Sequence, residues 1–205
     1  MRSLCAAVLL AALTIPAQAN PQAEVMPAVD AAKDRETLRK LSMCLAEQRP
    51  RWARATLSHP YLSEAQASVA TEVVSGDDKC LRGDEVEITF RTSTIVGALA
   101  EYFVRADMGK ADITRVSSAL ATIAPLNSSE DFALCVAARD PAAALELVRS
   151  EPGSASEASS ASVLGGRVPA CTQAGELLNV DTQALRSLMA TALYRGVTTV
   201  TGSAS

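Results

Sequence analysis

The sequence predicts an all-α protein of two tandem, pseudo-symmetric helical repeats, each closed by one disulfide and joined by a helical connector. Three observations predict this class. Two pairs of cysteines share the same separation of 36 positions: Cys44 with Cys80, and Cys135 with Cys171. Apolar residues recur at the three- and four-residue spacing of amphipathic helices in both halves. Matching residue types follow the two cysteine pairs in the same order, as expected of an internal repeat.

The first 19 residues have the features of a cleavable secretory signal. Arg2 precedes a short apolar run, which ends in Pro16 and the small-residue triplet Ala17-Gln18-Ala19. The run is shorter than the roughly 20 residues that a membrane-spanning helix needs, so a membrane anchor is the weaker interpretation. Asn20, and not a cysteine, follows the expected cleavage point, which argues against a lipid anchor. We therefore expect a periplasmic or secreted protein with no membrane span after cleavage.

The repeat and the signal together predict the organisation of the whole chain. The expected segments are the signal peptide (1–19), a flexible N-terminal segment (20–32), the first helical repeat (33–105), a helical connector (106–128), the second helical repeat (129–196) and a disordered tail (197–205).

The correspondence between the repeats extends beyond the cysteines. Met43-Cys44-Leu45-Ala46 matches Leu134-Cys135-Val136-Ala137 residue by residue. At the same offset Pro50 matches Pro141, Leu57 matches Val148 and Ser63 matches Ser154; after a one-residue deletion Thr92 matches Thr182 and Arg105 matches Arg195. Alanine and serine matches are expected by chance in this composition, but cysteines and a proline in fixed register are not.

Each repeat is expected to begin with two helices. The first carries an apolar stripe of Leu38, Leu41, Cys44 and Leu45, matched by Phe132, Cys135 and Val136. The second begins at Pro50 or Pro141, because the first helical position has no hydrogen-bonding role for the missing N–H. Asp140 is a good N-cap for the second copy.

A third and a fourth helix complete each repeat. The third begins near Ser63, where Gln66 completes a capping box and the buried side holds Val69, Ala70 and Val73. Its counterpart over 153–166 is rich in serine and glycine, so we expect it to be frayed, shortened or partly a loop. The fourth helix begins after a cap at Thr92 or Thr182 and buries Ile95, Leu99, Tyr102 and Phe103 in one copy, and Leu185, Met189 and Leu193 in the other.

The connector between the repeats is also expected to be helical. Its apolar residues recur at helical spacing until Pro125 stops them: Ile113, Val116, Leu120 and Ile123. Minor strand-like pieces are possible at 85–90 and 176–180.

The four cysteines of the mature chain are interpreted as structural disulfides. Four cysteines allow three connectivities, and the repeat symmetry selects Cys44–Cys80 and Cys135–Cys171. A closed loop of about 37 residues contributes on the order of 4 kcal/mol in the chain-entropy model, which matters in units of only about 70 residues. Zinc binding and redox catalysis are the rival interpretations, but the sequence has no CxxC cluster or partnering histidines.

Composition and motifs argue against several functions. Removing the signal, whose only charge is Arg2, takes the formal net charge from −4 to −5, and aromatic residues make up 3% of the chain. An acidic chain with few aromatic rings is not typical of a nucleic-acid-binding protein. We interpret His59 as a surface-loop residue because Ser150 replaces it in the second copy. The acidic residues Asp77, Asp78, Asp84, Glu85 and Glu87 match no calcium loop and are interpreted as a solvated surface.

The segment Cys135-Val136-Ala137-Ala138-Arg139-Asp140-Pro141, with a downstream cysteine and the later segment 188–195, resembles small exported proteins of sphingomonad-type alphaproteobacteria. The likeness covers most of the mature chain, twice over. It implies the same helical architecture and compartment, and it implies no catalytic residue.

We therefore predict no catalytic, cofactor-binding or metal-binding residues, and a non-enzymatic periplasmic or secreted binding or scaffold protein. Duplication creates a seam in which an unknown protein, a peptide or a small apolar ligand could lie. Two alternatives remain: a structural envelope protein that self-associates, and a hydrolase-like enzyme with dispersed carboxylates. Trp52 is expected to pack against the disulfide-linked helices.

Overall fold

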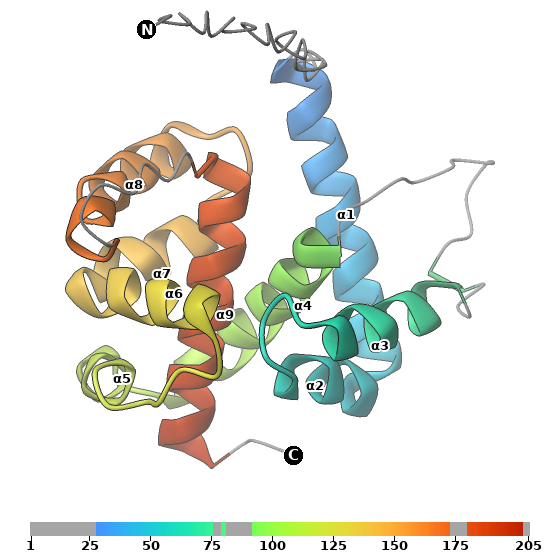
Figure 1. Ribbon diagram of the computed structural model, residues 1–205. Helices are drawn as coiled ribbons and strands as arrows, with labels where there is room; N and C mark the ends of the chain where they lie inside the picture. Colours follow the sequence, from blue (N-terminus) through green and yellow to red (C-terminus); the bar gives the residue numbers. More distant parts are fainter. Residues whose placement is uncertain (1–27, 76–78, 81–91, 173–179, 203–205) are drawn as a thin grey trace, which may run out of the picture.

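The computed structural model describes residues 28–75, 79–80, 92–172 and 180–202, and all regular secondary structure in these ranges is helical (Figure 1). The elements in chain order are α1 (Ala28–Gln48), α2 (Pro50–Ser58), α3 (Glu64–Ser75), α4 (Thr92–Asp107), the 3-10 helix η1 (Met108–Lys110), α5 (Ile113–Leu120), α6 (Ser128–Arg139), α7 (Pro141–Arg149), α8 (Ala155–Gly165), the 3-10 helix η2 (Val168–Ala170) and α9 (Thr182–Thr201).

Helices α4 and α9 cross at the centre of the molecule and form its most extensive helix–helix contact (Figure 1). Gly97 of α4 lies directly against Ser187 of α9. A Cβ atom at position 97 would lie 2.4 Å from Ser187 Oγ and 2.7 Å from its Cα. The crossing therefore depends on the absence of a side chain at Gly97, because packed helices cannot separate without losing contacts.

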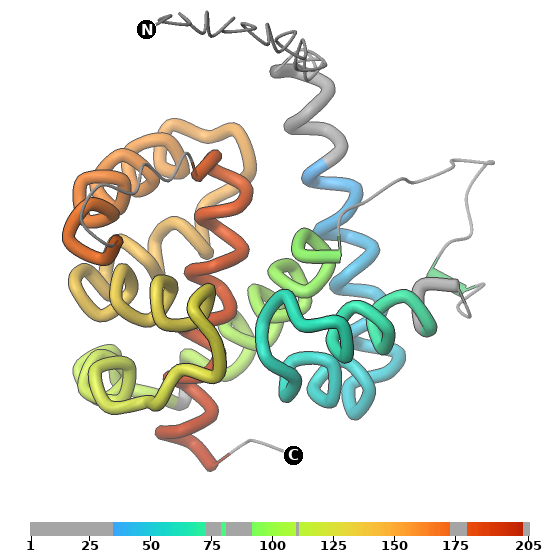
Figure 2. Tube along the Cα trace, in the orientation of Figure 1, coloured from blue at the N-terminus to red at the C-terminus, as the bar shows by residue number. Residues whose placement is uncertain are grey.

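The other helices pack around this crossing. Helix α1 packs along α4, and α2 and α3 complete the first half, while α5, α6, α7 and α8 all contact α9 (Figures 1 and 2). One cluster of buried apolar side chains runs through both halves. Its fully buried members include Leu45, Ile95, Leu99, Leu147, Leu164, Met189 and Leu193.

The apolar stripes expected from the sequence are confirmed for most of their residues, although Leu38, Val69, Tyr102 and Phe132 are only partly buried and the side chain of Val73 lies outside the described ones. Leu45, Val136 and Ile95 are fully buried, as are Met189 and Leu193 of the last helix. The helix starts are confirmed as well, because α2 and α7 begin at Pro50 and Pro141. Asp140 caps α7 by accepting a hydrogen bond from the Ala143 amide at 3.1 Å.

The third helix begins with the capping box expected at Ser63. The amide of Gln66 donates to Ser63 Oγ at 3.2 Å, and Gln66 Oε1 accepts from the Leu62 amide at 2.9 Å. Ser154 and Glu157 form the same arrangement at the start of α8, where the Glu157 amide donates to Ser154 Oγ at 3.1 Å. Two orphan donors are thus satisfied at each helix start.

The expectation of a frayed or partly looped helix over 153–166 is wrong. Helix α8 is regular over 11 residues, from Ala155 to Gly165. Its capping box fixes the first turn, and Leu164 is fully buried while Ser160 is 7% exposed. Small residues in α8 let it approach α7 closely, so tertiary packing outweighs the low helix propensity of serine.

The chain ends and two helix boundaries also differ from expectation. The disordered tail predicted from residue 197 is wrong, because α9 continues to Thr201 with Val197 at 1% exposure. The predicted flexible segment 20–32 is wrong for its last five residues, since α1 begins at Ala28. Helix α5 ends at Leu120 and does not reach Pro125. The cap of α9 is Asp181, and Thr182 is the first helical residue.

The two halves share backbone features at the 91-residue offset that aligns their cysteines. Helices α2 and α7 are both nine residues long. The loop after each of them contains a residue with positive φ at the same relative position, Leu62 (63°) and Gly153 (79°). Left-handed backbone is uncommon for leucine, so the loop geometry and not the residue type is shared.

Several predicted features lie outside the described part of the chain. These are the signal peptide (1–19), the strand-like piece at 85–90 and nearly all of the one at 176–180, and the acidic residues Asp77, Asp78, Asp84, Glu85 and Glu87. Among the residues that the structure describes, no helix is both long and apolar enough to cross a membrane.

Candidate functional site

Two disulfides have the connectivity predicted from the matching cysteine separations. Cys44 pairs with Cys80 and Cys135 pairs with Cys171, with a Cα–Cα distance of 5.7 Å in each pair. Both bonds join the first helix of a half to a residue shortly after its third helix, which ends at Ser75 or at Gly165. All four of these cysteines are bonded, so none of them offers a free thiol for chemistry.

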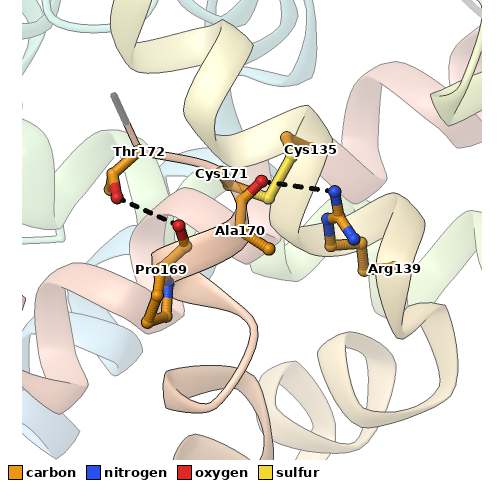
Figure 3. Close-up of a disulfide and its surroundings, with 6 residues drawn as sticks. All are labelled: Cys135, Arg139, Pro169, Ala170, Cys171 and Thr172. Atoms are coloured by element: carbon orange, nitrogen blue, oxygen red, sulfur yellow. Dashed lines mark hydrogen bonds between the residues drawn. A yellow bond between two sulfur atoms is a disulfide. The ribbon is translucent and has the colours of Figure 1, made fainter. Parts of the chain in front are cut away.

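The second disulfide is reinforced by a hydrogen bond (Figure 3). Arg139 lies one helical turn after Cys135 in α6, and its Nη2 donates to the Ala170 carbonyl at 3.2 Å. Ala170 is adjacent to Cys171, so the sulfur bridge and the guanidinium hold the same turn. The residue after this bridge, Thr172, donates to the Pro169 carbonyl at 3.4 Å.

A network of buried charged side chains joins four helices next to the α4–α9 crossing: α1, α4, α8 and α9. Arg186 of α9, 3% exposed, donates from Nε and Nη2 to the two carboxylate oxygens of Glu101 of α4, both at 2.9 Å. Its Nη1 donates to Glu157 of α8 at 3.2 Å. Arg35 of α1 also binds Glu157, at 3.1 Å, and Arg105 binds Glu101 at 3.1 Å. Each buried carboxylate in the network is thus bound by two guanidinium groups.

A second set of polar contacts ties the first half to the second, and we call Tyr61, Asn127, Glu130 and Arg195 the seam latch. The Tyr61 amide donates to Glu130 Oε1 at 3.0 Å, and its carbonyl accepts from Asn127 Nδ2 at 2.7 Å. Arg195 of α9 forms an ion pair with the other Glu130 oxygen. Both backbone polar groups of Tyr61 are therefore bound by side chains from the second half.

A groove lies next to the seam latch, between α2, α6 and α9, and shares Glu130 and Arg195 with it. We call it the seam groove. Its volume is about 490 Å³, within the range of small-molecule sites. It is lined by residues of both halves: Arg51, Arg54, Ala55, Leu57, Ser58, His59, Leu126, Glu130, Tyr194, Arg195 and Thr198. A small cavity of about 10 Å³, room for one water molecule, shares five of these residues and continues the groove toward Tyr61.

The floor of the seam groove is held in place by Arg54. Its guanidinium lies 4.1 Å from the centre of the Phe103 ring and donates to Asp107 Oδ2 at 2.8 Å. Burial raises the pKa of the neighbouring Tyr194 phenol, and the hydrogen bond and charge of Arg54 partly offset that rise. Arg54 is therefore a fixed cation, because an aromatic face and a buried carboxylate both orient it.

A second groove of about 410 Å³ lies on another part of the seam, near Tyr61, Phe132 and Leu188. Its wall includes Thr172 and Val180, which flank residues 173–179 outside the described part of the chain. The shape of this groove is therefore not fixed by the described residues, and the seam groove is the better candidate site.

The residues singled out from the sequence are only partly brought together. His59, expected in a surface loop, is the half-buried C-cap of α2 and lines the seam groove. Trp52, expected to pack against the disulfide-linked helices, lies on α2 and packs, partly buried, against the apolar core. Within the described ranges, no group of three or more histidine, cysteine, aspartate or glutamate side chains could hold a metal ion.

The groove's arginines and Glu130 were not predicted as site residues. Two weak signals exist in the sequence: Arg51 and Arg54 flank Trp52, and Arg195 aligns with Arg105 between the repeats. Neither signal predicts that α2 and α9 meet. Comparison with protein-family models, with curated proteins and with solved structures finds no match to this chain.

Proposed function

We propose that this protein is an exported, non-enzymatic binding protein that holds a small ligand in the seam groove. Export is supported by the N-terminal signal pattern and by two disulfides, which persist in oxidising compartments. The periplasm or the extracellular space is the proposed location.

The seam groove carries this proposal. It combines the volume of a small-molecule site with walls from both halves, and its lining brings apolar side chains together with charged and polar groups that could orient a ligand. The seam latch fixes the two walls relative to each other, because Glu130 and Asn127 of the second half bind the backbone of Tyr61 in the first. A largely pre-formed site loses little free energy to ordering when a ligand binds.

The duplication of one helical unit is part of the same proposal. It is supported by the equal cysteine separations, the equal lengths of α2 and α7, and the shared positive φ at Leu62 and Gly153. A duplicated unit explains why the site lies at the seam, since two similar units that pack together leave a groove between them.

The alternative of a hydrolase with dispersed carboxylates has less support. General acid–base hydrolysis commonly uses two carboxylates or a histidine with an orienting acid. Glu130 is the single carboxylate among the groove's described residues, and Arg195, Tyr61 and Leu126 already bind its oxygens. This arrangement favours binding over catalysis.

A groove-filling substitution tests the binding function. Ala55 is an exposed residue of α2 that lines the groove, so Ala55→Trp should block it without disturbing the core. Ala142→Trp, at an exposed position in α7 that lines none of the grooves described above, is the matched control. A small-molecule library should be screened by thermal shift against the mature, oxidised wild type and both variants.

We expect at least one compound of a few hundred daltons to raise the melting temperature of the wild type and of Ala142→Trp but not of Ala55→Trp. A screen in which every stabilising compound acts equally on all three proteins would contradict a ligand site in the groove. Concentration-dependent self-association on a sizing column, lost in Ala55→Trp, would instead favour the structural envelope protein.

A further inference from the structure

One face of α2 presents two arginines to the seam groove. Arg51, Arg54, Ala55 and Ser58 follow the i, i+3, i+4, i+7 spacing of a single helix face, and all four line the groove. Arg195 of α9 also lines it. Three guanidinium groups thus converge on one groove of a chain whose formal net charge is −4.

The three arginines of the groove carry one positive charge more than their two carboxylate partners, Glu130 in the lining and Asp107 behind Arg54, neutralise. Asp107 binds Arg54, and Glu130 binds Arg195. Arg51 is exposed, and its side chain makes no hydrogen bond or ion pair within the described ranges. Asp107 and Glu130 orient Arg54 and Arg195, and the exposed Arg51 adds a guanidinium that has no carboxylate partner within the described ranges, so the three side chains form a cationic wall. One singly charged anion complements this wall.

Apolar side chains also line the groove, next to the polar residues Ser58, His59 and Thr198. Ala55 and Leu57 line it from α2, and Leu126 lines it from the segment before α6 with 55% of its surface exposed. An exposed leucine beside a groove gains free energy when an apolar chain covers it. The ligand that fits both surfaces has one negative group and an apolar body.

We propose that the seam groove binds an amphipathic monocarboxylate, with its carboxylate against Arg51 and the α2 arginine face and its apolar chain along Leu57 and Leu126. The proposal rests on the proposed binding function and adds the chemical class of the ligand. Carboxylates suit this wall because arginine N–H groups bind planar oxyanions in a paired geometry. The excess of one charge favours a monoanion over a phosphate or a dicarboxylate.

Calorimetric titration of the mature, oxidised protein with decanoate tests the class of ligand. Three further probes distinguish the contribution of the negative charge from that of the apolar chain. 1-Decanol has the chain without the charge, decyltrimethylammonium has the chain with the opposite charge, and acetate has the charge without the chain. We expect decanoate to bind most tightly, with an affinity that falls as salt is raised because the contact is partly ionic. Ala55→Trp should abolish that binding, and Ala142→Trp should not.

Arg51 provides the decisive variant because it is exposed and its replacement leaves the core and the seam latch intact. Arg51→Gln should weaken decanoate binding by about fivefold to tenfold, and Arg51→Glu by more, while 1-decanol binding stays unchanged. Arg115→Gln, at an exposed position on α5 outside the seam groove, should bind decanoate as the wild type does.

The outcomes separate this inference from the binding function itself. If 1-decanol or the cation binds as tightly as decanoate and Ala55→Trp abolishes it, the groove is a ligand site but the monocarboxylate assignment is overturned. Equal affinity of decanoate for the wild type and Arg51→Glu would overturn it as well. If neither these probes nor the library compounds distinguish Ala55→Trp from Ala142→Trp, the binding function also fails.

Discussion

At the scale of single residues, buried charged side chains make the most consequential contacts between distant parts of the chain. Arg186 is bound to Glu101, which lies 85 positions earlier, and to Glu157. Its guanidinium also donates to the carbonyl of Ser150 at 2.7 Å. A buried charge is tolerated when its hydrogen-bonding groups are satisfied in this way, and removing one partner leaves the other charge unpaired.

Replacing Arg186 with Gln should destabilise the fold strongly. The change leaves Glu101 and Glu157 with fewer cationic partners in a buried environment, so we expect a loss of about 3–5 kcal/mol in the free energy of unfolding. Arg167→Gln is the control, since the Arg167–Asp140 pair is near the surface and should contribute at most about 1 kcal/mol. Urea denaturation of the oxidised proteins measures both, and equal losses would contradict the structural role of the network.

Tyr61 should make the stability fall at alkaline pH. Burial raises its pKa above the ordinary value of about 10, and a hydrogen bond with Ser187 opposes the rise only in part. Below the ordinary pKa the phenol is protonated in both the folded and the unfolded protein. Above it the unfolded chain releases the proton while the folded protein keeps it, so the free energy of unfolding falls as the pH rises. Between pH 9 and pH 11, Tyr61→Phe should lose about 1 kcal/mol less than the wild type in urea denaturation. Parallel pH profiles would refute this assignment.

At the scale of helices, their starts follow local sequence rules, whereas their lengths and crossings follow tertiary contacts. Helices α2 and α7 begin at prolines, and α3 and α8 begin at serine capping boxes, as short motifs predict. Helix α8 is longer than its composition suggests, and α9 continues past the predicted end because Val197 is buried. Burial of an apolar side chain outweighs a weak local preference.

Two neighbouring residues, Asp181 and Thr182, are candidates for the N-cap of α9. The Asp181 carboxylate accepts a hydrogen bond from the Ala184 amide at 2.7 Å, while Thr182 is already helical. Asp181→Ala should therefore lower the free energy of unfolding by about 1 kcal/mol. Thr182→Ala, the position that the repeat alignment selects, should change it by less. A larger loss for Thr182→Ala in the same thermal denaturation assay would contradict the assigned cap.

The crossing of α4 and α9 should be sensitive to a single methyl group. In Gly97→Ala the new Cβ meets the Ser187 backbone and side chain, so the two helices must separate. We expect a destabilisation of about 1–3 kcal/mol, as for other overpacked cores. Gly165→Ala is the matched control, because nothing lies within 4 Å of a Cβ at that helical position. A neutral Gly97→Ala in urea denaturation would show that the crossing has more room than the structure indicates.

At the scale of the whole molecule, two disulfide-linked halves share one apolar core. The core cluster includes residues of both halves, and the seam latch and the Arg186 network join them through polar contacts. The halves are therefore expected to unfold together and not as independent units. The candidate binding site lies between them, so anything that loosens one half also alters the groove.

Both disulfides should form and should contribute separately to stability. The intact mature protein should weigh four hydrogens less than its reduced form in mass spectrometry. Replacing both members of either pair with alanine, Cys44 with Cys80 or Cys135 with Cys171, should lower the free energy of unfolding by about 4 kcal/mol. Free thiols in both pairs, or a double replacement without effect, would contradict a structural role for the bonds.

The seam groove shows the limit of sequence reasoning for this protein. The sequence singles out Trp52 and His59; His59, at the end of α2, lines the groove, while Trp52 of α2 packs against the core. It does not group Arg51 and Arg195, which are far apart in the chain and meet only after α2 and α9 pack. Residues in one helix face share a spacing, but residues on different helices share none.

The sequence by itself determined the helical class, the two cysteine pairs and the starts of most helices, because these depend on periodicity, fixed separations and short capping motifs. The tertiary structure alone decided which charges are buried, how far α8 and α9 extend and where the groove lies. These features arise from contacts such as Glu101 with Arg186, whose energy depends on distance in space and not on position in the chain.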